Sequence, residues 1–129
     1  MLETTTYRPD GILVPAANYS PAVRRGGIVA VSGQIAFAPG SYGPGGAPGI
    51  QEQARLVFDN VRRLLEAAGS SFSEVIMVRV FLTREQDFAA MNAVFNETFT
   101  EPYPARTTAW GHLPGGLLIE ADALAVSGG

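Results

Sequence analysis

The chain has 129 residues, of which 47% are hydrophobic and 16% charged, and its net charge is −3. This length suits one domain, residues 1–129, around one core, and the acidic balance without a basic run argues against nucleic acid as the main partner. There is no cysteine, no lysine and one histidine, His112, which excludes disulfides, thiolate metal sites, lysine Schiff bases and multi-histidine zinc sites. Arginine, carboxylates, hydroxyls, backbone amides and water remain for chemistry, so we expect no metal and no cofactor.

Three further features of the sequence bear on membrane binding, cellular location and assembly. No apolar run approaches the roughly 20 residues that span a bilayer, so we expect no membrane partner. The first ten residues, MLETTTYRPD, lack the basic and apolar blocks of a signal peptide, which predicts a cytoplasmic location. The high apolar content of so short a chain would leave adhesive surface on a monomer and favours an oligomer.

The first half of the chain contains one clear strand and one clear helix. Residues 27–37, GIVAVSGQIAF, are rich in valine and isoleucine and predict a strand, whereas glycines and prolines make residues 38–49 a loop. Residues 50–69 repeat apolar side chains at steps of three and four, which predicts an amphipathic helix with Gly69 at its C-terminal cap. The face expected to be buried consists of Ile50, Ala54, Val57, Phe58, Val61, Leu64, Leu65 and Ala68.

A strand and a second helix are predicted next. Residues 74–83 are short and β-branched, which is typical of a strand, and alternation divides them between two faces. One face is expected to carry Ile76, Val78, Val80 and Leu82, and the other Val75, Met77, Arg79 and Phe81. Thr83 is expected to cap the second helix, with Gln86 completing a capping box. The inner side of this helix is expected to hold Phe88, Met91, Val94, Phe95 and Phe99.

Two closing strands complete the predicted order. They are residues 105–113 and 116–126, separated by a Pro-Gly-Gly turn, and prolines at 102 and 104 end the helix before them. The order of strands, helix, strand, helix and two strands predicts an α+β sandwich, with two helices on one face of a mostly antiparallel sheet. The other face must then meet water or another subunit.

The last strand is expected to place two carboxylates on that uncovered face. Small apolar residues alternate with Glu120 and Asp122, which therefore point away from the helices, about 7 Å apart along the strand. Arg106 and Arg79 are expected on the same side, although a register slip of one residue would reverse either assignment. Two interpretations remain open. These charges form solvated or interfacial salt bridges, or they form an anion site at a subunit boundary, with Arg106 holding a carboxylate and Glu120 activating water.

Six segments, in this order and spacing, resemble the RidA/YjgF family of imine deaminases over nearly the whole chain. They are YSPAV (19–23), VSGQIAF (31–37), FDNVRRLLEAAGSSFSEV (58–75), VFLTREQDFAAMNAVF (80–95), PARTT (104–108) and LPGGLLIEADALAV (113–126). The resemblance implies a chorismate-mutase-like sandwich assembled as a homotrimer, with the sheets facing inward as a barrel and the sites in clefts between subunits. It also implies hydrolysis of reactive imines and enamines to 2-keto acids and ammonia, without a cofactor.

Site roles follow from the same resemblance. It implies that Arg106 binds the carboxylate of a small metabolite and that Glu120 orients the attacking water. Tyr19 is expected to line the pocket, and Ser32 and Gly33 to contribute wall and backbone contacts. A further set of substitutions departs from the family pattern and implies a divergent branch with a different pocket. These are Thr108, expected to bind substrate where many members have cysteine, together with Arg79, Trp110 and Ala121.

Two functions other than catalysis on imines stay open. The first is a trimer that binds a keto acid without turning it over. The second is a ribonuclease or chaperone-like role, which the resemblance allows because such roles are attributed to some relatives. The acidic charge and the lone histidine argue against nuclease chemistry. The sequence leaves the natural substrate and pathway unnamed.

Overall fold

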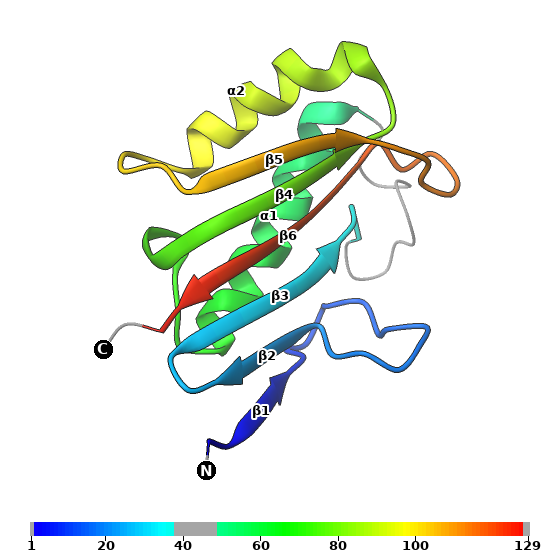
Figure 1. The fold of residues 1–129 in the computed structure, drawn as a ribbon. Helices are drawn as coiled ribbons and strands as arrows, with labels where there is room; N and C mark the ends of the chain where they lie inside the picture. Colours follow the sequence, from blue (N-terminus) through cyan, green and yellow to red (C-terminus); the bar gives the residue numbers. More distant parts are fainter. Residues whose placement is uncertain (1, 38–48, 128–129) are drawn as a thin grey trace.

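The computed structural model describes residues 2–37 and 49–127, and of the loop expected at 38–49 only Gly49 lies within that part. Within these two ranges, six strands and two α-helices follow one another, with two short 3₁₀ turns before β4 and α2 (Figure 1). Their bounds are β1 Thr4–Tyr7, β2 Ala22–Arg25, β3 Ile28–Gln34, α1 Ile50–Ala67, η2 Phe72–Glu74, β4 Val75–Leu82, η3 Glu85–Asp87, α2 Phe88–Thr98, β5 Ala105–Trp110 and β6 Ile119–Val126.

The strands form one sheet in the order β1-β2-β3-β6-β4-β5. All neighbouring pairs are antiparallel except β4 and β5, which run parallel because α2 carries the chain back between them. Both helices lie behind the sheet in Figure 1, and its other face is open. The predicted α+β class is therefore confirmed. The two closing strands do not pair with each other, since β6 enters the middle of the sheet and β5 becomes an edge.

The core lies between α1, α2 and the covered face of the sheet. The helix predicted at 50–69 forms as α1, and Gly69 follows it with a φ of +82°, a conformation that favours glycine. The rings of Phe58, Phe95 and Phe99 meet edge-on or tilted between the two helices. Alanines 121, 123 and 125 of β6 are buried beneath them, which leaves alternate residues of that strand on the open face. No helix of the described residues is both long enough and apolar enough to cross a membrane.

The predicted alternation along β4 is wrong at its start. A register irregularity between Val75 and Met77 shifts the pairing with β6. Val75 is consequently buried, whereas Ile76 is 51% exposed instead of joining Val78 in the core. A bulge of this kind inserts one unpaired residue and exchanges the faces of what precedes it. From Val78 onward the expected alternation holds.

The predicted beginning of the second helix is also wrong. Thr83 is not its N-cap, because η3 comes first and α2 begins at Phe88. Both carboxylate oxygens of the buried Asp87 accept hydrogen bonds of 2.8 Å from the Arg84 guanidinium, and this pair fixes the turn in place of a capping box. Because the helix starts later than expected, Phe88 is its first residue and is partly exposed instead of buried on the inner side.

A buried glutamine connects α1 to the beginning of β6. The side chain of Gln53 has no exposure; its Nε2 donates to the Gly116 carbonyl (3.2 Å) and its Oε1 accepts from the Leu118 backbone N–H (2.9 Å). These bonds satisfy two backbone groups just before the strand that carries Glu120. Gln53 of α1 therefore fixes the segment that leads into β6.

Gln53→Leu is expected to lower the free energy of unfolding by about 1 to 3 kcal/mol, because two part-buried hydrogen bonds to the backbone are lost. Gln51→Leu is the matched control on the exposed side of α1, and it should change stability by less than about 0.5 kcal/mol. Urea unfolding of both variants measures the difference. Equal stabilities would contradict the role given to Gln53.

Candidate active site

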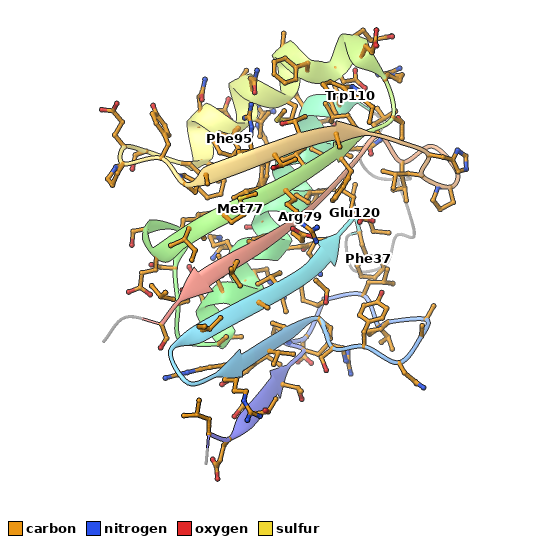
Figure 2. The ribbon with its side chains drawn as sticks, in the orientation of Figure 1. Phe37, Met77, Arg79, Phe95, Trp110 and Glu120 are labelled. Carbon is orange, nitrogen blue, oxygen red and sulfur yellow. The ribbon has the colours of Figure 1, made fainter. Side chains whose placement is uncertain are left out.

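A hollow of about 640 Å³ lies on the open face of the sheet. It is formed by β3, β4 and β6 together with the segment that precedes β2. Its lining residues are Tyr19, Ala30, Val31, Ser32, Gly33, Met77, Arg79, Glu120, Asp122, Ala123 and Leu124. Figure 2 places Arg79 and Glu120 together over the middle of this face. Four of the residues expected at the site, Tyr19, Ser32, Gly33 and Glu120, are thus brought together.

The Glu120 carboxylate packs against bare backbone at Gly33. The pairing of β3 with β6 is irregular between Val31 and Gln34, and Gly33 lies within this interruption. A Cβ atom on Gly33 would stand 2.5 Å from Glu120 Oε2 and 2.8 Å from its carboxyl carbon. Only glycine leaves room for the carboxylate in this position.

Glu120 is a half-buried acid whose carboxylate accepts no hydrogen bond from any residue that the structure describes. Burial raises the pKa of Glu120 above its ordinary value, and the negative charge of Asp122 raises it further. A carboxylate with a raised pKa and free oxygens can accept a proton from water. Glu120 therefore has the properties of a general base.

The hydroxyl of Ser32 is used within the chain. It donates to the Ser20 carbonyl at 2.6 Å, and the Ser32 backbone N–H donates to the Pro21 carbonyl at 2.8 Å. These two bonds hold the segment that carries Tyr19 against β3. The Tyr19 side chain remains exposed at the rim of the hollow. Ser32 thus positions one wall of the hollow, and its hydroxyl proton is used in the hydrogen bond to Ser20.

Arg106 lies on the other side of the sheet, so the expectation that it shares a face with Glu120 is wrong. In the parallel pairing of β4 with β5, Arg106 is level with Val78 and Thr108 with Val80, and both valines are buried on the helix side. The Arg106 Cζ atom lies 4.7 Å from the centre of the Phe95 ring and 5.8 Å from that of Phe88. Arg79, in contrast, lies on the open face as expected.

The surroundings of Arg106 are apolar and its charge is uncompensated. Burial lowers the pKa of Arg106 from its ordinary value, and an arginine remains protonated at neutral pH. Aromatic ring faces attract its cationic guanidinium, but it pairs with no carboxylate of the described residues. The guanidinium edge is therefore available to an anion from outside the chain.

Two unpartnered polar atoms accompany Arg106. Thr108 projects from the same side of β5, and its buried Oγ1 has no hydrogen-bond partner among the described residues; the same holds for the buried Oδ1 of Asn92 in α2. Asn92 is one turn from Phe88 and from Phe95, so all three share a helix face. Sequence reasoning missed Asn92; its only signal is a polar side chain among the inner positions of an apolar helix.

The predicted residues therefore form two groups on opposite faces of one sheet. The open-face group contains the base candidate Glu120 with Gly33, Ser32 and Tyr19, and the edge group contains Arg106 and Thr108. A small molecule held by Arg106 cannot also reach Glu120 of the same chain, because the sheet lies between them. The open-face group has a candidate base but no free group to bind an anion. The edge group can bind an anion through Arg106 but has no candidate base.

Comparison with known proteins places the chain in a family. A profile of the family described as Endoribonuclease L-PSP matches residues 11–127. Protein mmf2 of Schizosaccharomyces pombe, a mitochondrial protein, is 46% identical over 97 residues, or 74% of this chain and 75% of its own length. The 2-iminobutanoate/2-iminopropanoate deaminase of Dermatophagoides farinae is 34% identical over 113 residues, or 87% of this chain and 88% of its own.

TdcF of Escherichia coli is similar in both sequence and structure. It is 36% identical over 126 residues, which cover 94% of this chain and 93% of TdcF. The crystal structure of TdcF with bound serine matches this fold with a TM-score of 0.83, over 96% of this chain and 99% of that chain. The profile match and these relatives agree with the order of segments in the sequence. The chain belongs to the Endoribonuclease L-PSP family, which includes the RidA/YjgF proteins.

Proposed function

We propose that this protein is a hydrolytic deaminase of reactive 2-imino and enamine acids, and that its active site is shared between neighbouring copies in a homotrimer. Arg106 of one copy binds the substrate carboxylate, and Glu120 of the next copy activates the attacking water. The deaminase name of a relative that this chain matches over 87% of its length supports the reaction class.

The observation that carries this proposal is the separation of two uncompensated charges. The Arg106 guanidinium is half-buried among aromatic rings, and the Glu120 carboxylate is half-buried against Gly33, each without a partner in the described part of the chain. Burying an unpaired charge is costly, so such groups are retained where a ligand or another subunit completes them. If the edge group of one copy lies against the open face of another, Arg106 and Glu120 face the same cleft, and a bound substrate can complete both charges.

The chemistry requires only these residues. A guanidinium fork binds a planar carboxylate through two parallel hydrogen bonds and fixes the imine carbon next to the open face. Glu120 accepts a proton from water as its oxygen attacks that carbon. The proton is then passed to the nitrogen, which gives a carbinolamine. A second proton moves from the new hydroxyl to the amino nitrogen, the C=O bond forms as the C–N bond breaks, and a 2-keto acid and ammonia leave. An imine is already electrophilic, so neither a lysine nor a thiol is needed.

Generating imines with an amino-acid oxidase and following ammonia release tests the proposal. The protein should accelerate release well above the uncatalysed rate with at least one 2-imino acid. The same clamp would hold a 2-keto acid without turnover, and calorimetry with 2-ketobutyrate distinguishes this case. Keto-acid binding without any acceleration would replace the deaminase by the non-catalytic binding protein as the function of this site.

A further inference from the structure

An ion pair stands inside the hollow beside Glu120. Arg79 of β4 is directly opposite Asp122 of β6. Arg79 Nε donates to both carboxylate oxygens, at 3.0 and 3.2 Å, and Nη2 donates to Oδ2 at 2.7 Å. The Arg79 side chain is 57% exposed, but that of Asp122 only 17%, so the arginine covers the acid from the solvent side. The hydrogen bond to Asp122 raises the pKa of Arg79 further, so Arg79 stays charged.

This pair supplies the charges nearest to Glu120 among the lining residues. Asp122 is two positions along the same face of β6, or about 7 Å. From β3 the carboxylate meets the uncharged Gly33, and Phe81 of β4 is the cross-strand partner of Glu120. Tyr19 contributes a phenol at the rim. In the trimer of the proposed function, Arg106 of the neighbouring copy would complete the set.

We propose that Arg79 is a positioning residue for Glu120: by pairing with Asp122 it offsets part of the second negative charge of the hollow, which favours an ionised Glu120 that is open to water. This inference rests on the proposed function for the role of Glu120, but not for the electrostatics. Arg79 acts through Glu120 and not on the substrate. The inference also gives a role to Arg79, which departs from the pattern of the family that the sequence resembles.

The sign of the effect follows from the charges. Without Arg79, the bare negative charge of Asp122 disfavours a second carboxylate, so the pKa of Glu120 rises. Without Asp122, the positive charge of Arg79 favours the carboxylate, so the pKa falls. Without both, burial remains but the raising effect of Asp122 is lost, so the pKa falls below that of the parent, by less than in the variant that keeps Arg79. One charge at about 7 Å near a solvated surface shifts a pKa by roughly 0.5 to 1 unit.

Carbon-detected NMR titration of the Glu120 carboxyl tests this prediction in Arg79→Met, Asp122→Asn and the double variant. We expect an upward shift of roughly 0.5 to 1 pH unit in Arg79→Met and a downward shift of that size in Asp122→Asn. The double variant should show a smaller downward shift. The acid limb of the pH dependence of kcat/KM should move in the same directions. Arg55→Met removes an exposed arginine that pairs with Glu97 on the far side of the helices, and it should move neither.

The possible outcomes distinguish the role of Arg79 from the proposed deaminase function. Equal Glu120 pKa values in the parent and both single variants would overturn the inference and reduce the pair to a cross-strand contact. If Arg79→Met does not fold, Arg79→Gln and Asp122→Asn still carry opposite expected shifts. A parent without imine deamination would overturn the proposed function, while the NMR titration would still decide whether Arg79 sets the ionisation of Glu120.

Discussion

Replacing Arg106 with methionine is expected to lower kcat/KM for 2-imino acids by roughly 100- to 1,000-fold. The substrate carboxylate would lose two charge-assisted hydrogen bonds from a planar fork, and nothing else in the edge group carries a positive charge. The methionine side chain retains contact with the Phe95 ring, so the variant should fold and assemble as the parent does. Steady-state kinetics with an oxidase-generated imine measures the loss.

Two controls give this prediction its specificity. Arg106→Lys keeps the charge but not the fork, and it should retain an intermediate activity, roughly tenfold below the parent. Arg55→Ala removes an exposed arginine of α1 and should leave turnover unchanged. Parental activity in Arg106→Met would refute the assignment of this residue as the carboxylate clamp.

Gly33→Ala is expected to lower kcat by about 100-fold or more while changing stability little. The new Cβ would stand 2.5 Å from Glu120 Oε2, a contact that real side chains do not tolerate. The obstructed group is the end of a flexible side chain, so the carboxylate would rotate away and the backbone would remain in place. A base displaced from its water loses most of its contribution, which is typically 10² to 10⁴-fold.

A second glycine serves as the matched control for Gly33. A Cβ on Gly27, in the turn between β2 and β3, would meet nothing within 4 Å, so Gly27→Ala should be active. Glu120→Gln should lower kcat as far as Gly33→Ala, since both remove the carboxylate from its place. The prediction fails if Gly33→Ala retains full activity, or if it loses activity only because it unfolds.

The sequence predicted the face that carries Glu120 because β6 alternates without ambiguity. The apolar residues at 119, 121, 123 and 125 are all buried beneath the helices, and they force the acids outward. The same reasoning failed for β5, where the two threonines of ARTTAW stand on opposite faces and the alanines, both on one face, are too small to set the phase. The phase of β5 comes from its parallel pairing with β4, which is not a local property of the sequence.

Non-local contacts explain the remaining differences. Thr83 and Gln86 satisfy the spacing of a capping box, but the pair of Arg84 with buried Asp87 stabilises a 3₁₀ turn there and delays the helix. The bulge beside Ile76 and the matching of Arg79 with Asp122 depend on the register between β4 and β6. Composition and periodicity define the strands, but they do not define how far each strand slides along its neighbour.

Mixing two inactive variants tests most directly whether the site is shared between copies. Arg106→Met and Glu120→Gln would be unfolded together, refolded as mixed assemblies and assayed beside each variant refolded alone. If each site takes Arg106 from one copy and Glu120 from another, about one site in four of an equal mixture is intact, and about a quarter of parental activity should return. A mixture as inactive as its components, despite proven subunit exchange, would contradict the shared site.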